Sequence, residues 1–310
     1  MLLYKFTMNL INWLLEGDVS IQYQTYRDLL YIDKPELQKL ISLEGYGKRI
    51  LDLQNDNLHW GLRYYQPKWI SSHYTLLELR RLNILPNDNI DKLLDYILSN
   101  HVTESKGVSC SKKIEQPDIC VDGMALNFFC YFKVEEERLK SIIDYVISQQ
   151  MNDGGFNCRL ERSGAKHSSL HSTVSLIEGL NSYIEGGYKY RLDELIKIRK
   201  ECIEFILIHR LYKSDRTGNV INKSFLMLSY PPRWKYDILR ALVAIMDSGT
   251  KYDERMQDAI DVLYKKRRKD GTWPVQAKHP GEVHFDMEKT GESSRWNTLR
   301  VLRVLKYFSR

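Results

Sequence analysis

The sequence lacks the features that mark membrane and secreted proteins. No stretch approaches the run of about 18 apolar residues that a transmembrane helix needs. Residues 1–17 are apolar but are interrupted by polar residues at helical spacing, which predicts an amphipathic first helix and not a signal peptide. Five cysteines in 310 residues are few and odd in number, which favours a reducing compartment. We therefore expect a cytoplasmic protein with no transmembrane segment.

Charge of one sign is also scarce. The formal net charge is only +6, and the basic residues are spread along the chain and form no basic arm, so no nucleic-acid partner is expected. The one dense basic cluster, residues 265–269, lies at the end of a predicted helix, where cations complement the helix dipole. An anion contact by this cluster is the alternative.

Hardly any segment has the pattern of a β-strand, and the dominant feature is instead a repeat. Four copies begin about 49 residues apart, and two more follow at wider spacing. The copies are Gln24-Thr25-Tyr26, His73-Tyr74-Thr75, Asp122-Gly123-Met124, His171-Ser172-Thr173, Trp234-Lys235-Tyr236 and Trp296-Asn297-Thr298. Apolar residues follow each copy at i+3, i+4 and i+7, which predicts that each copy begins a helix.

A second set of helices is predicted between the repeat helices. The repeat helices are expected near 19–31, 69–83, 120–133, 168–185, 234–248 and 293–309. The second set is expected near 5–16, 35–54, 88–101, 135–150, 190–211 and 254–268. The first set is the more apolar and would form an inner ring covered by the second. We predict one all-α domain over residues 1–310, an (α/α)6 toroid of about twelve helices.

A polar residue, a short turn and an aromatic residue recur where second-set helices end. The clearest copy runs from Gln150 to Phe156, and weaker copies run from Gln54 to Trp60 and from Lys269 to Trp273. The Asp-Gly pair of these turns tolerates positive φ, and the aromatic ring can fold back over the helix end. The motif resembles the glutamine-to-tryptophan repeat of squalene and oxidosqualene cyclases. The whole chain is similar in layout to the superfamily of terpene cyclases and protein prenyltransferase β subunits, which implies an α/α toroid with a central cavity.

Residues at the starts of the first-set helices are the candidates for a functional site. If these helices run in one direction around the ring, one pit would contain Tyr23, His73, Asp122, His171, Trp234 and Trp296. Positive helix ends would lower the pKa of a carboxylate there and disfavour a charged imidazole. Such a pit could hold an anion, a metal or an acid–base pair. The catalytic candidates are His73, Asp122, His171 and Tyr236, although Asp122 could equally be an N-cap and the histidines could be structural.

The resemblance also implies a metal. Protein prenyltransferase β subunits bind zinc through an Asp-x-Cys pair and a later histidine, and this chain has Asp118-Ile-Cys120 and His171 at comparable places. These residue types bind zinc, and three of them would leave a position for a thiolate or water. The candidate ligands are thus Asp118, Cys120 and His171, with Cys158 and His167 as further candidates. The alternative is that the two cysteines are small buried residues.

The candidate substrate-binding residues are aromatic and basic. Aromatic rings at the helix starts could bury a prenyl chain or stabilise a cation, namely those of Tyr23, Tyr26, Tyr74, Trp234 and Trp296. Arg233 and Arg295 could contact a diphosphate or carboxylate, or pair with Asp237 or Glu292. The aromatic residues could also be ordinary core.

The absence of one motif narrows the reaction class. Class II terpene cyclisation needs an Asp-x-Asp-Asp acid, and no such run occurs. We therefore expect a prenyltransferase-like enzyme that binds an apolar or isoprenoid-like ligand in a toroid cavity, with alkyl transfer assisted by zinc. The alternatives are a non-catalytic toroid that binds a peptide or another ligand and a glycan-processing toroid enzyme. The sequence does not show whether a protein partner is required.

Overall fold

The computed structural model describes residues 2–111 and 117–309 and is mostly helical. Within those residues the paired strands are two short antiparallel ones, β1 (Trp273–Pro274) and β2 (Ser293–Ser294). The predicted all-α class is therefore confirmed. No helix in the described part of the chain is both long enough and apolar enough to cross a membrane.

Every repeat copy leads into a helix of the first set. These helices are α2 (Val19–Gln24) with its π-helical continuation η1 (Thr25–Leu30), α5 (Ser72–Leu82), α7 (Ile119–Tyr131), α10 (Leu170–Glu185), α12 (Ile238–Asp247) and α14 (Arg295–Phe308).

The second set alternates with the first. It comprises α1 (Leu2–Leu15), α3 (Pro35–Leu40), α4 (Gly45–Leu51), α6 (Asp88–His101), α8 (Glu136–Ser148), α11 (Leu192–Ile208) and α13 (Gln257–Lys265). Short helical turns fill some of the connections: α9 (Leu160–Ser163), η2 (Lys223–Leu226) and η3 (Glu254–Met256).

The fifth repeat copy differs from the others in its position on the helix. The side chain of Asp237 accepts a hydrogen bond from Arg240 N at 2.8 Å and so caps α12, which begins at Ile238. Trp234 and Tyr236 therefore lie in the loop before the helix, and the prediction that this helix begins at residue 234 is wrong. The other starting residues lie within helical turns.

The segment predicted as one helix over 35–54 forms two helices, α3 and α4. Residues 41–44 separate them, and α4 begins at Gly45, whose φ of +66° is a conformation that glycine adopts at low cost. Asp18 also stabilises this break, because its Oδ2 accepts a hydrogen bond from Tyr46 N at 2.7 Å while its Oδ1 accepts one from Ser20 N at 2.9 Å. One aspartate thus caps both α2 and α4.

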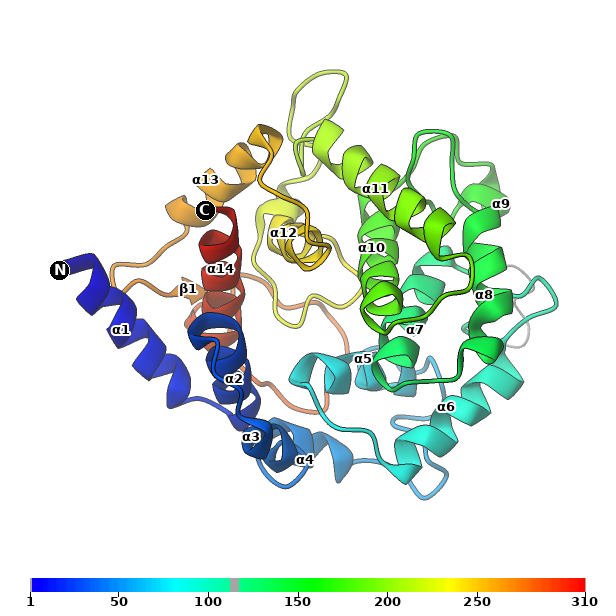
Figure 1. Cartoon of the computed structure of the whole chain (residues 1–310), viewed down its shortest axis with the longest axis horizontal. Helices are drawn as coiled ribbons and strands as arrows, with labels where there is room; N and C mark the ends of the chain where they lie inside the picture. Colours follow the sequence, from blue (N-terminus) through cyan, green and yellow to red (C-terminus); the bar gives the residue numbers. More distant parts are fainter. Residues whose placement is uncertain (1, 112–116, 310) are drawn as a thin grey trace.

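First-set helices pack against their successors along the chain. α5 contacts α7, α7 contacts α10, α10 contacts α12, α12 contacts α14, and α14 returns to α2 and η1. A hydrogen bond of 2.8 Å from Gln24 Nε2 to Arg81 O joins α2 to α5. Figure 1 shows α5, α7, α10, α12 and α14 toward the middle of the molecule, with α6, α8, α11 and α13 around them.

The turn motif at the end of second-set helices makes the same contact in three places. The backbone N–H groups of the three aromatic residues donate to hydroxyls at the start of the next first-set helix: Trp60 to Ser72, Phe156 to Thr173 and Trp273 to Thr298, at 3.0–3.1 Å. The indole N–H groups of Trp60 and Trp273 donate back to Ile50 O and Leu263 O. The aromatic residues fold back over the helix ends, as the motif predicts.

Two glycines allow α7 and α10 to approach closely. A Cβ on Gly123 would lie 2.6 Å from Ser175 O, and one on Gly179 would lie 2.4 Å from Gly123 O. Both obstacles are backbone atoms, so the helices would have to separate to accept a methyl group. The closest helix pair of the first set thus depends on the absence of these two side chains.

We predict that Gly179→Ala lowers the free energy of unfolding by about 2–4 kcal/mol, because overpacking against backbone forces the helices apart. The measurement is urea denaturation followed by circular dichroism. Gly218→Ala is the control, since Gly218 has a φ of +69° and open space where a Cβ would stand, so it meets only a backbone cost of about 1 kcal/mol. Equal effects of the two substitutions would contradict the packing argument.

Candidate functional site

Residues from all the first-set helices line one cavity, which we call the central cavity. Its space is about 760 Å³, including the part open to solvent. Its lining residues are Gln24, Arg80, Arg81, Asn127, Glu178, Asn181, Glu185, Tyr230, Pro232, Arg240, Val243, Asp247, Trp296, Arg300 and Arg303. Most of these side chains are polar or charged, which is unusual for the inner faces of apolar helices.

One ion pair neutralises part of the charge in the central cavity. Arg240 Nε and Nη2 donate to the two carboxylate oxygens of Glu178 at 2.8 and 2.7 Å, and Nη2 also donates to Ser175 Oγ at 3.0 Å. Burial disfavours the charged form of Glu178, but the charge and hydrogen bonds of Arg240 outweigh burial and lower the Glu178 pKa. Both groups therefore stay charged and hold α10 against α12.

Arg303 is also neutralised by carboxylates. Its Nε lies 3.0 Å from Asp28 Oδ2, and its Nη2 lies 3.1 Å from Asp247 Oδ1. Burial, and then the nearby charge of Asp247, raises the pKa of Glu185. The acidic groups at this side of the cavity are thus either paired with Arg303 or shifted toward the protonated form.

Other donors that line the central cavity are buried and lack partners. Among the described residues, Arg81 Nη1, Arg81 Nη2, Arg80 Nε and Trp296 Nε1 have no hydrogen-bond acceptor. Arg81 Nη1 forms an ion pair with Glu78 Oε2 at 3.6 Å but no hydrogen bond. Arg300 donates to the neutral Asn297 Oδ1 at 3.3 Å, and burial lowers its pKa in spite of the Asp237 charge. The cavity therefore presents N–H groups of cationic side chains that lack hydrogen-bond acceptors in the described structure.

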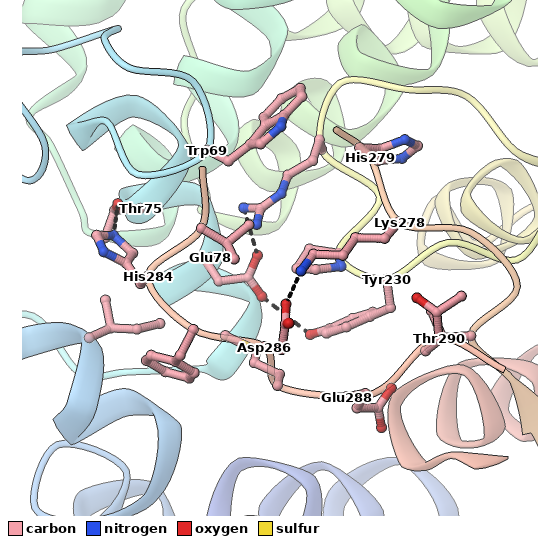
Figure 2. A pocket seen from close by; sticks show the side chains of 17 residues that line it. Trp69, Thr75, Glu78, Tyr230, Lys278, His279, His284, Asp286, Glu288 and Thr290 are labelled. Carbon is pink, nitrogen blue, oxygen red and sulfur yellow. Dashed lines mark hydrogen bonds and ion pairs between the residues drawn. The ribbon is translucent and has the colours of Figure 1, made fainter. Parts of the chain in front are cut away.

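A second cavity, the capped cavity, lies behind a wall shared with the central cavity. The shared residue is Tyr230, whose ring stacks on that of Trp296 with centroids 5.1 Å apart and planes 7° apart. Tyr230 OH donates to Glu78 Oε1 at 3.3 Å, and Arg233 Nη1 lies 3.8 Å from Glu78 Oε2. Figure 2 shows Glu78 directed between these two groups.

Residues 275–290, which we call the capping loop, cover the capped cavity. Figure 2 shows this loop curving past Glu78 and Tyr230. Five residues of the loop are labelled there: Lys278, His279, His284, Asp286 and Glu288. The loop is fixed at several points by hydrogen bonds: Trp69 Nε1 to Pro280 O at 2.7 Å, Thr75 Oγ1 with His284 Nε2 at 2.9 Å, Tyr46 OH to Met287 O at 2.6 Å and Trp296 N to Glu288 Oε1 at 3.0 Å. These bonds close this side of the molecule over Glu78.

A third cavity, the rim cavity, collects the residues predicted to bind zinc. Asp118, Cys120, Cys158 and His171 all line it, together with Tyr65, Lys68, Asn157, Arg159, Ser169, Ser172 and Trp234. His171 Nδ1 accepts a hydrogen bond from Tyr236 N at 2.8 Å, which leaves Nε2 as its free ring nitrogen. Burial, and then the charges of Arg240, Lys235 and His279, lower the pKa of His171 to about 4.

The two cysteines of the rim cavity are in contact. Cys120 N donates to Cys158 Sγ at 3.3 Å. The interaction between the two thiols raises the pKa of the Cys120 thiol, with burial adding to the effect, and lowers the pKa of the Cys158 thiol. In the described part of the chain, no three His, Cys, Asp or Glu side chains lie close enough to hold a metal ion. His167 is exposed and lines none of the three cavities.

The six predicted pit residues do not lie in one cavity. Trp296 lines the central cavity, and His171 and Trp234 line the rim cavity. Tyr23, His73 and Asp122 line none of the three cavities and are buried. The pit was predicted on the assumption of six equivalent helix starts, and the loop position of Trp234 is one visible departure from that symmetry.

The two buried titratable residues of the predicted pit each have one partner. His73 Nδ1 lies 2.8 Å from Tyr64 OH, and its Nε2 has no partner in the described structure. Asp122 Oδ1 accepts a hydrogen bond from Val108 N at 2.6 Å, and its Oδ2 has none. Burial raises the pKa of Asp122 well above its usual value. Asp122 is not the N-cap of α7, because it lies inside the helix, after Asp118.

The remaining predicted site residues make mostly local contacts. Tyr74 OH lies 2.9 Å from Tyr65 OH, and Tyr236 OH donates to Leu211 O at 2.5 Å. Cations lie over the two N-terminal tyrosine rings, Arg27 over Tyr23 and Lys34 over Tyr26.

Arg233 and Arg295, the two arginines predicted to bind substrate, lie near partners that the sequence did not predict. Arg233 lies beside Glu78 and over the Trp69 ring, in the capped cavity. Arg295 donates to Trp13 O at 2.9 Å and lies over the Trp13 ring. The predicted pairings with Asp237 and Glu292 are therefore wrong: Asp237 caps α12, and Glu292 pairs with Lys289.

Sequence reasoning missed the charged residues of the central cavity. The missed residues are Arg80, Arg81, Glu178, Glu185, Arg240, Asp247, Arg300 and Arg303, and Glu78 of the capped cavity was missed as well. They lie further along the first-set helices than the starting motifs. A usable signal was present, because charged residues within apolar helices that pack on both sides are expected only where they are paired or functional.

Comparison with known proteins gave no match: neither a protein-family model nor a curated protein sequence matches this chain.

We predict a pH-dependent loss of stability caused by His73. Burial, and then the charge of Arg81, lower the pKa of His73 to about 3, whereas an unfolded histidine has a pKa near 6.5. As the pH falls below about 6.5, only the unfolded state takes up the proton. The contribution of neutral His73 to the free energy of unfolding is therefore fully present above pH 6.5 and is lost progressively toward pH 3. Between pH 7 and pH 5, the free energy of unfolding of the wild type should fall by about 2 kcal/mol more than that of His73→Gln.

Urea denaturation at the two pH values measures this difference. Because the variant keeps every other histidine, their common contributions cancel in the comparison. His167→Gln, at an exposed position, is the control variant. A wild type and a His73→Gln variant with parallel pH profiles would rule out a neutral buried His73.

Proposed function

We propose that this chain is an (α/α)6 toroid whose central cavity binds the anionic group of a small molecule. Three observations support the ring: the alternation of the two helix sets, the successive contacts of first-set helices, and the single cavity to which all of them contribute. The hydrogen bond from Gln24 to Arg81 O supports closure between the first and second repeats.

The unpartnered donors in the central cavity carry the proposal. A buried guanidinium without an acceptor costs free energy, so proteins keep such groups mainly where a ligand or water completes them. Arg81 offers two nitrogens without a hydrogen-bond acceptor, of which Nη1 is ion-paired with Glu78 at 3.6 Å, and Trp296 offers its indole N–H. An arginine side chain binds carboxylate or phosphate oxygens through parallel hydrogen bonds.

A diphosphate ester with an apolar chain is the ligand class that the resemblance to prenyltransferases suggests. The stacked rings of Tyr230 and Trp296 would face the apolar part, and Arg81 and Arg300 would bind the phosphates. The enzyme class that follows is a cytoplasmic prenyl transferase. A toroid that only binds the same ligand is the alternative.

We predict that Arg81→Gln and Arg300→Gln each weaken the binding of inorganic diphosphate by about 10- to 100-fold, because a hydrogen bond to a charged group contributes about 1.5–3 kcal/mol. Isothermal titration calorimetry on the full chain measures the affinity. Arg255→Gln is the matched control, since Arg255 is ion-paired with Glu204 and Asp253 away from the cavity.

The choice of ligands separates the parts of this proposal. Tighter binding of farnesyl diphosphate than of inorganic diphosphate, with no binding of farnesol, would support an isoprenoid diphosphate. Equal affinity for the two diphosphates would restrict the site to the anion. Release of diphosphate from farnesyl diphosphate would indicate catalysis, and its absence would favour the binding toroid. If diphosphate does not bind the wild type, the anion site is rejected.

Zinc-assisted alkyl transfer at the rim cavity is the second candidate. One observation favours it: Asp118, Cys120, Cys158 and His171, which lie in three parts of the sequence, line the same cavity. The described residues do not form a ready site for three ligands, so the side chains would have to move to bind a metal. We derive no reaction step from such a metal.

Elemental analysis tests the zinc site. After expression in zinc-supplemented medium, we predict about one zinc ion per chain, lost in His171→Ala and in Cys120→Ala. Cys202→Ala is the control, because Cys202 is buried in α11 away from the rim cavity. Zinc-free wild-type protein would remove this candidate.

A further inference from the structure

Two cysteines that are 38 residues apart in the sequence meet in the rim cavity. Cys120 lies in the first turn of α7, and Cys158 lies in the loop before α9. The backbone N–H of Cys120 donates to Cys158 Sγ at 3.3 Å, so the two residues are in direct contact. Both are free thiols and are partly exposed. Two cysteines in direct contact need only local movement to form a disulfide.

Hydrogen-bond donors gather on the sulfur of Cys158. Cys120 N donates to it at 3.3 Å, and Ser172 Oγ lies at the same distance. Because Ser172 Oγ already accepts the backbone N–H of Cys158, its own hydrogen can be directed at the sulfur. Donors of this kind stabilise a thiolate, which is the form that attacks a disulfide.

Small molecules can reach this pair. The rim cavity is lined largely by polar side chains, including Lys68, Asn157 and Arg159, and both cysteines contribute to its wall. Cys130 and Cys202, in contrast, are buried in helices α7 and α11. Cys130 and Cys202 therefore serve as shielded internal references for the Cys120–Cys158 pair.

We propose that Cys120 and Cys158 form a reversible disulfide by exchange with a low-molecular-weight disulfide of the glutathione class. This inference does not rest on the proposed function, because it uses neither the central cavity nor a metal. The disulfide would tie the first turn of α7 to the loop that leads toward α10, and it would take away both candidate zinc thiolates.

The exchange is balanced in two steps. Cys158 thiolate attacks one sulfur of the small disulfide, whose S–S bond breaks and releases a thiolate that takes up a proton. Cys120 then loses its proton and attacks Cys158 Sγ in the mixed disulfide, which releases the second small thiol. The two protein thiols are oxidised, and one small disulfide is reduced to two thiols.

Peptide mapping of the full chain tests the proposal. Reduced wild-type protein is equilibrated with mixtures of glutathione and glutathione disulfide, quenched with acid, alkylated and analysed by mass spectrometry. We expect a Cys120–Cys158 linkage that dithiothreitol reverses. Cys130 and Cys202 should stay reduced in every mixture and should therefore be recovered in alkylated form. Because this result uses the wild type, it does not depend on whether a variant folds.

Three variants test the order of attack. In Cys120→Ser, glutathione should stay on Cys158 as a stable mixed disulfide. In Cys158→Ser, glutathione should react with Cys120 about tenfold more slowly than with Cys158 in the first variant, because the Cys120 thiolate is less stabilised. Cys110→Ser is the matched control and should form the linkage as the wild type does. Thiols that stay reduced in the wild type, or a linkage that involves Cys110, would overturn the proposal.

Discussion

The ion pair between Arg240 and Glu178 determines which charges in the central cavity are left for a ligand. Arg240 is buried and Glu178 is largely so, and the two hydrogen bonds between them join α10 to α12 across the cavity wall. Removing one partner would leave an uncompensated buried charge, so the pair fixes the two helices as well as the local charge. Glu178 is already paired with Arg240. Arg81 and Arg300 have no carboxylate within hydrogen-bonding distance in the described structure.

The two sides of the first-set helices differ in what covers them. On the side of the capped cavity, the capping loop is tied to Trp69, Thr75 and Tyr46 by hydrogen bonds, and it covers Glu78. The central cavity lies beyond the stack of Tyr230 on Trp296 and contains the residues further along the helices. A ligand of the arginines would therefore enter from the side away from the capping loop.

The sequence predicted the helices well and their ends less well. Apolar spacing and the folded-back aromatic residues found both helix sets, because these signals depend on contacts close in sequence. The break at Gly45 and the late start at Ile238 depend on Asp18 and Asp237, single capping side chains that periodicity does not reveal. The grouping of Asp118, Cys120, Cys158 and His171 was predicted from the resemblance to prenyltransferase β subunits, whereas the arginine cluster depends on side chains from separate helices.

Helix ends explain only part of the arginine excess. The C-terminus of a helix carries partial negative charge, so Arg80 and Arg81 in the last turn of α5 would be favourable there without any ligand. That interaction accounts for the sign of the charge but not for buried N–H groups that lack acceptors. Arg300 lies past the first turn of α14, away from the helix C-terminus, and burial disfavours its charge in spite of the nearby charge of Asp237. A cation kept in that place is better explained by an anionic ligand than by the stability of the fold.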